Sequence, residues 1–173
     1  MKSAFSAELA QAVGYVVLEA ADAEDSIGEL IVLRCGMDKP HMSWWQSGTG
    51  LADALESIGD PTLQPIANEL RELLPLRHQV VHGLWLEGKG GAHLTMLRSK
   101  STKKNPKLPG ADVGGWSNNL LAVLAERFRV LDRMADDAIS DAMGLPRSPN
   151  SLLPPRSEPV VLPDRTPRGQ GPA

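Results

Sequence analysis

Residues 66–84 carry an apolar stripe with a strong cation at its centre, and this arrangement limits what the chain can fold into. The apolar positions recur every three or four residues, as on one face of an α-helix, at Ile66, Leu70, Leu73, Leu74, Val80, Val81 and Leu84. At 100° per residue, Arg77 falls near the middle of that face. A buried guanidinium needs a partner, so Arg77 must be paired within the fold or face a crevice or second molecule. His82 follows five positions later, and Gly83 predicts that the helix ends there.

The apolar stripe predicts a central helix over residues 65–82, and the same periodicity predicts three further helices. The first spans about residues 6–33 and ends at Gly36, and the second spans residues 50–58. Ser117 is expected to cap a last helix that ends at Gly144. Pro75 removes one backbone donor and is expected to kink the central helix just before Arg77. The side chains predicted to face inward from the first, second and last helices are Leu9, Val13, Val16, Val17, Ala20, Ile27, Leu30, Ile31, Leu51, Leu55, Ile58, Leu120, Leu124, Phe128, Leu131, Ala135 and Ala138.

Two segments interrupt or follow this helical pattern. Residues 84–98 predict a β-hairpin around a glycine-rich turn, and residues 98–107 form a loop with five cations and no acid. From residue 145 the chain holds eight of its 14 prolines without helical spacing, which predicts a disordered tail able to dock as polyproline. We therefore expect an all-α antiparallel bundle over residues 1–144, with one hairpin insertion, and a tail over 145–173.

Composition narrows the setting. Aromatic residues make up only 4% of the chain, which favours a helical core over a β-rich one. The formal net charge of −3 gives no general attraction for nucleic acid, so RNA contacts must come from local basic clusters. The single Cys35 fits a reducing compartment, and no segment is predicted to span a membrane. We expect a cytoplasmic protein.

The stretch from Arg77 to Gly83, with its Arg-x4-His spacing, resembles the signature of HEPN domains. These are small all-α modules, many of which are metal-independent ribonucleases of bacterial toxin and phage-defence systems. The resemblance implies an endoribonuclease without cofactor or metal, a homodimer whose two motifs face each other, and an antitoxin as a candidate partner. Many members have Asn where this chain has His78. One branch has Tyr where this chain has Leu84, and its absence argues against the branch whose Tyr is modified by a nucleotidyltransferase.

The motif residues suit RNA cleavage by attack of the 2′-hydroxyl on the adjacent phosphate. His82 is the candidate base, because imidazole titrates nearest neutral pH. Arg77 is the candidate phosphate ligand, since its planar fork matches phosphate oxygens and stays charged. His78 could donate a proton to the leaving group or make a further hydrogen bond. The resemblance implies that the products are a 2′,3′-cyclic phosphate and a 5′-hydroxyl. Electrostatic contacts with RNA are predicted from Arg98, Lys100, Lys103, Lys104 and Lys107.

Four alternatives remain open from the sequence. Arg77 and His82 could be purely structural, and either hydrogen-bond buried carbonyls or pair with Glu19, Asp22 or Asp25 of the first helix. The chain could be an inactive HEPN-like module for binding or dimerisation. His78 and His82, four residues apart, could bind a metal together with a carboxylate. Trp44 and Trp45 could stack on bases or pack against the bundle end. The apolar face around Arg77 is the expected dimer surface.

Overall fold

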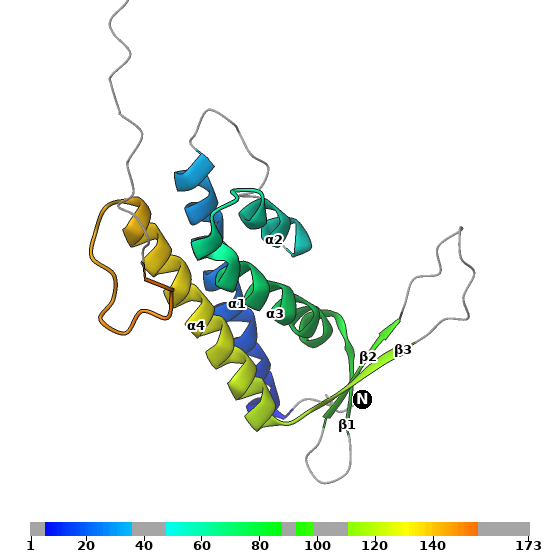
Figure 1. Ribbon diagram of the computed structural model, residues 1–173. Coiled ribbons are helices and arrows are strands. Elements are labelled where there is room, and N and C mark those ends of the chain that lie inside the picture. Colours follow the sequence, from blue (N-terminus) through cyan, green and yellow to red (C-terminus); the bar gives the residue numbers. More distant parts are fainter. Residues whose placement is uncertain (1–5, 36–47, 88–92, 99–110, 156–173) are drawn as a thin grey trace, which may run out of the picture.

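A computed structural model describes residues 6–35, 48–87, 93–98 and 111–155 (Figure 1). Within these ranges the chain is mostly helical and carries one small antiparallel sheet. The elements in chain order are α1 (Ala7–Cys35), α2 (Thr49–Glu56), the 3₁₀ helix η2 (Pro61–Leu63), α3 (Gln64–His82), β1 (Leu84–Glu87), β2 (His93–Arg98), β3 (Ala111–Trp116) and α4 (Asn118–Ala142). None of the described helices has the length and hydropathy needed to cross a membrane.

Local capping chemistry sets several helix ends where the sequence predicted them. The Asp60 carboxylate accepts a hydrogen bond from the Thr62 amide at 2.9 Å, and Pro61 begins η2, which leads into α3. The Ser117 hydroxyl accepts from the Leu120 amide at 3.2 Å and starts α4. Gly144 follows α4 with φ +72°, a conformation that favours glycine, and the Leu145 amide bonds to the Ser140 carbonyl. These contacts confirm the predicted start and end of α4, and the bounds of α3, Gln64–His82, lie within one residue of the predicted 65–82.

The helices do not form a simple antiparallel bundle. Glu24 of α1 contacts Arg77 of α3, and Arg34 contacts Asp60 just before α3, so α1 and α3 run in opposite directions. On α4, Arg129 contacts Glu19 and Asp132 contacts Ser26, so α1 and α4 run in the same direction, as Figure 1 shows. The expectation of an all-antiparallel bundle is therefore wrong for this pair. The sheet lies at the end of α3 and turns the chain back into α4.

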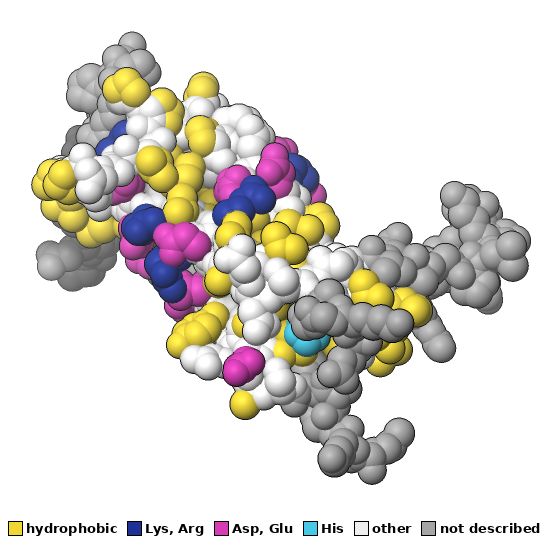
Figure 2. Space-filling view, turned by 90° about the horizontal axis from the view of Figure 1, so that it is seen from below, with side chains coloured by type: hydrophobic (Ala, Val, Ile, Leu, Met, Phe, Trp, Pro, Cys, Tyr) yellow, Lys and Arg dark blue, Asp and Glu magenta, His cyan; other side chains and the backbone are white. Residues whose placement is uncertain are grey.

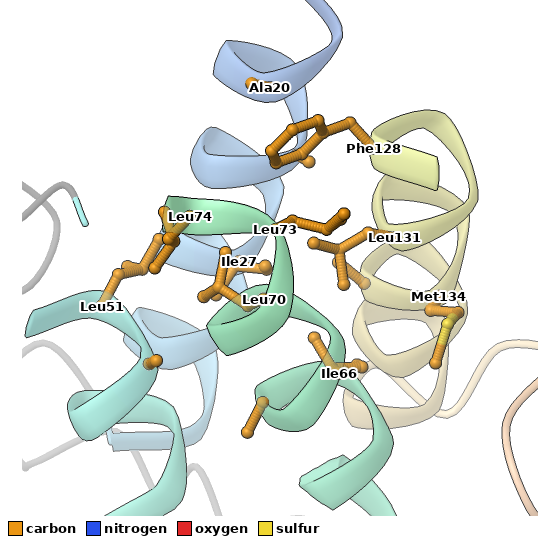
Figure 3. Packing of buried hydrophobic residues seen from close by; sticks show 14 of the residues in the cluster. Ala20, Ile27, Leu51, Ile66, Leu70, Leu73, Leu74, Phe128, Leu131 and Met134 are labelled. Atoms are coloured by element: carbon orange, nitrogen blue, oxygen red, sulfur yellow. The ribbon is translucent and has the colours of Figure 1, made fainter. Parts of the chain in front are cut away.

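The core lies between α1, α3 and α4, with α2 covering one side (Figure 3). Phe128 projects from α4 toward α1 beside Ala20, and both are fully buried. Most side chains predicted to face inward are buried, but Val17 is partly exposed and Leu120 is 50% exposed. Leu120 lies in the first turn of α4, where it lines an open pocket together with Leu76 and Gln79 of α3 and residues 114–116 of β3.

The sheet contains the predicted hairpin and one strand that the sequence did not predict. Strands β1 and β2 pair antiparallel with Trp85 opposite Thr95, and β3 adds to β2 with Gly114 opposite Thr95. Trp85 donates its indole N–H to the Val80 carbonyl at 3.0 Å, and Trp116 donates to the Thr95 hydroxyl at 2.8 Å. This face is anchored to α3, while the opposite face exposes the apolar side chains of Leu84, Leu86 and Leu94.

Residues 145–155 follow α4 and pack against it. The Asp137 carboxylate accepts a hydrogen bond from the Ser148 amide at 2.8 Å, and Arg147 pairs with Asp141. Leu153 is buried against the core cluster. Residues 145–155 are thus held on α4, although the sequence placed the start of a disordered tail at residue 145. The prediction for residues 156–173 lies outside the described residues.

Candidate functional site

Arg77 faces α1 and is paired there with Glu24. The Arg77 Nε atom lies 3.6 Å from the Glu24 Oε1 atom, and their side chains are 26% and 11% exposed, respectively. Both of these atoms are buried and make no hydrogen bond to any described residue. The exposed part of the Arg77 side chain therefore lies away from Nε, so the pair orients the guanidinium without enclosing it.

Glu24 was not predicted from the sequence as the partner of Arg77. The carboxylates predicted to pair with Arg77 were Glu19, Asp22 and Asp25, and the partner lies on the same helix between Asp22 and Asp25. Glu24 lies four residues after Ala20 and three before Ile27, both fully buried, so it borders the buried stripe of α1. That spacing is the signal that could have identified it.

Arg77 differs from the other arginines whose side chains are described. Each of the others donates at least one hydrogen bond to a carboxylate; these are Arg34, Arg71, Arg127, Arg129, Arg133 and Arg147. Figure 2 shows basic side chains next to acidic ones on the face that it displays. Every lysine of the chain lies outside the described residues. Among the described arginine side chains, Arg77 is therefore the one that has a counter-ion but no hydrogen bond to a carboxylate.

His78 and His82 lie together on the exposed side of α3. Their ring centroids are 4.7 Å apart with the planes tilted by 50°, as expected for side chains four residues apart on one helix face. Both histidines are exposed. Imidazoles in this position are accessible to a large substrate.

Arg77 and His82 are not brought into contact within one chain. Helix α3 continues through Pro75 to His82, so the last turn is not unwound before the motif ends. Five residues of α-helix rotate a side chain by about 140°. One chain therefore carries two separate half-sites. Arg77 faces α1, whereas His78 and His82 face solvent.

Gly83 fixes the junction between the histidine pair and the sheet. A Cβ atom at this position would lie 2.4 Å from the Gln79 carbonyl oxygen and 2.8 Å from the Thr95 Cβ. Because the first of these neighbours is backbone, Gly83→Ala is expected to destabilise the fold by about 1–3 kcal/mol, measured by chemical denaturation. Gly115→Ala is the matched control, since a Cβ there meets nothing within 4 Å. Equal stability of the two variants would contradict this account.

The face around Arg77 that was expected to form a dimer surface is used inside the chain. Its buried members pack in the core; they are Ile66, Leu70, Leu73, Leu74 and Val80. Only the end of the stripe stays accessible, at Val81 and Leu84, of which Leu84 is 62% exposed. The physical reason is that α1 and α4 both need this face of α3 to complete the core.

Other predicted site residues lie outside what the structure describes. Lys100, Lys103, Lys104 and Lys107 fall in residues 99–110, and Trp44 and Trp45 fall in residues 36–47. Arg98 is the last residue of β2, opposite Ala111, but its side chain is not described. No three potential metal ligands gather among the described residues, so the His78–His82 pair has no carboxylate partner in that part of the chain.

Searches of protein-family models, of curated proteins and of solved structures found no match to this chain.

Proposed function

We propose that this protein is a metal-independent endoribonuclease of the HEPN type, acting in a toxin–antitoxin or defence setting in the cytoplasm. The observation that carries the proposal is the state of Arg77. It is oriented by Glu24 yet makes no hydrogen bond to it, on the helix that also presents two exposed histidines. An arginine held in this way retains its donors for phosphate oxygens.

Each motif residue has a role in this reaction. His82 accepts the proton of the 2′-hydroxyl as its oxygen attacks the adjacent phosphorus. Arg77 stabilises the negative charge that develops on the phosphoryl oxygens. His78 gives a proton to the departing 5′-oxygen. The strand is left with a 2′,3′-cyclic phosphate on one product and a 5′-hydroxyl on the other, and no metal takes part.

The reaction site is completed in this proposal by a second copy of the chain. The angle of about 140° between Arg77 and His82 on α3 keeps them from one phosphate within a single chain. In a two-fold dimer, the arginine of one copy can approach the histidines of the other. The exposed side chains of Val81 and Leu84, directly beside His82, supply apolar surface for such an interface.

The second candidate is an inactive HEPN-like module that binds a partner. It is favoured by the ion pair itself, because Arg77 already has a counter-ion within the fold. The two candidates differ in one property, since only the first turns RNA into products with cyclic-phosphate ends.

The experiment that separates them is incubation of the purified protein with total RNA in EDTA, followed by analysis of the product ends. Cleavage with 2′,3′-cyclic phosphates and 5′-hydroxyls is expected. Intact RNA at every protein concentration tested, with the protein folded by circular dichroism, would reject the ribonuclease in favour of the binding module.

Arg77→Ala is expected to reduce the cleavage rate by about 10²- to 10³-fold, the usual loss when a charge-stabilising donor is removed. Arg127→Ala is the matched control, since Arg127 is already hydrogen-bonded to Glu69 and Glu72. Rates are compared on a short fluorescent RNA, and folding is checked by thermal unfolding. Equal rates for the two variants would remove Arg77 from the proposed site.

A further inference from the structure

The Glu24–Arg77 pair is built differently from the other ion pairs between described residues. Each of the others is 3.3 Å or shorter and is accompanied by a hydrogen bond. Glu24–Arg77 is the longest, at 3.6 Å, and its two facing atoms are buried without a hydrogen bond to a described residue. The attraction between the two groups is thus mainly that of charge rather than of a directional bond.

This geometry gives Glu24 two opposite effects on an arriving phosphate. Its charge holds the guanidinium in one place, which spares a substrate the cost of ordering a long side chain. The same charge lies beside the position that a phosphate on Arg77 would occupy, and like charges in a poorly hydrated site repel strongly. The Glu24 carboxylate therefore orients Arg77 for a phosphate and also competes with that phosphate for the guanidinium.

We infer that Glu24 is a positioning residue of the proposed ribonuclease site, which holds Arg77 and yields it to an RNA phosphate. The inference rests on the proposed function, because it takes the ligand of Arg77 to be a phosphodiester. Glu24 would regulate that site, because an RNA phosphate that binds the exposed side of Arg77 must overcome the repulsion of the Glu24 charge.

The electrostatics of Glu24 agree with an arrangement that can be exchanged. Burial raises the pKa of the Glu24 carboxyl, and the charge of Arg77 and the Gly48 amide oppose this rise only in part. The ionised form of the Glu24 carboxyl is thus less stable in the fold than in water. With its pKa above the unfolded value, the carboxyl favours folding most at low pH, and this contribution is lost as the pH rises through its folded pKa. A neutral isostere should consequently leave the protein folded at neutral pH.

The test measures affinity of the full chain for an uncleavable oligonucleotide with 2′-O-methyl riboses, by fluorescence anisotropy at fixed salt. Glu24→Gln keeps the shape and removes the charge, so the Kd is expected to fall roughly tenfold. Glu72→Gln is the matched control, because it removes one carboxylate charge from an exposed ion pair. Its Kd is expected to change by less than about twofold.

Two further variants show whether the gain acts through Arg77. In the double variant Glu24→Gln with Arg77→Ala, the gain should vanish. Glu24→Asp keeps the charge and should bind as the parent does, which tests the inference even if Glu24→Gln folds poorly. The inference is overturned if Glu24→Gln and Glu72→Gln change the Kd equally, if the gain survives loss of Arg77, if Glu24→Asp binds as tightly as Glu24→Gln, or if no variant binds.

The outcome is separable from that of the proposed function. A parent protein that binds the oligonucleotide with the expected variant pattern but leaves RNA intact would reject the ribonuclease and keep the role of Glu24. A parent that cleaves RNA, with Glu24→Gln matching Glu72→Gln, would keep the ribonuclease and reject the role of Glu24.

Discussion

Replacing His82 with alanine is expected to lower RNA cleavage by about 10²- to 10⁴-fold, the range for loss of a general base. The fold should remain, because the imidazole is exposed and its ring contact is with His78 alone among the described residues. The measurement is the single-turnover rate on a short RNA in EDTA, with circular dichroism and thermal unfolding on the same samples.

His93→Ala is the matched control for this prediction. His93 lies on β2 with its ring 6.2 Å from that of Trp85, so the variant removes an imidazole near the sheet while both motif histidines stay in place. It should cleave at close to the parental rate. A His82→Ala protein that still cuts RNA as fast as His93→Ala would show that His82 is not the base, whatever Arg77 does.

The helices could be predicted from sequence because their signals are local. A helix face repeats every three or four residues, and its ends are set by single residues such as Ser117 and Gly144, whose contacts need nothing distant in the chain. Proline at position 75 did not end α3, since its missing amide removes one hydrogen bond while the buried face on either side stays in place. The direction of α4 relative to α1 could not be predicted in this way, because it depends on how the sheet turns the chain.

The third strand was missed for a physical reason. Residues 111–116 contain two adjacent glycines, which lower strand propensity and give no alternating pattern. A Cβ at Gly114 would lie within 2.6 Å of three atoms of the Gln79 side chain, so a larger residue there would require the end of that side chain to move. The glycines that let β3 lie close to α3 therefore weaken the sequence signal for this strand.

The candidate site shows the same division between local and distant information. The sequence identified Arg77 as a cation within an apolar face and required a partner for it, and this requirement is confirmed by the ion pair. Which carboxylate fills the role depends on how α1 and α3 pack, and Glu24 was not among those named. Helix α1 carries six acidic residues, and the one that faces Arg77 cannot be identified until the rotation of α1 about its axis is known.

Phe128→Ala is expected to destabilise the protein by about 3–5 kcal/mol, as for other large aromatic side chains removed from a core. The ring is fully buried between α4 and α1, where it fills the space that the small side chain of Ala20 leaves (Figure 3). Removal of the ring leaves a cavity between α1 and α4. The packing of these two helices sets the rotation of α1 about its axis, and this rotation sets the position of Glu24. Since small domains are stable by only about 5–15 kcal/mol, a large share of the stability should be lost.

Chemical denaturation followed by circular dichroism gives the free energy of unfolding for this variant and for Leu120→Ala as its matched control. Leu120 lies on the same helix but is 50% exposed, so its truncation should cost less than about 1 kcal/mol. If the two variants lost the same amount, the packing of α1 on α4 around Phe128 would not be the main source of stability. If Phe128→Ala alone is weakened, oligonucleotide binding should be lost at temperatures near its unfolding, because the helix that carries Arg77, His78 and His82 is held in place by this core.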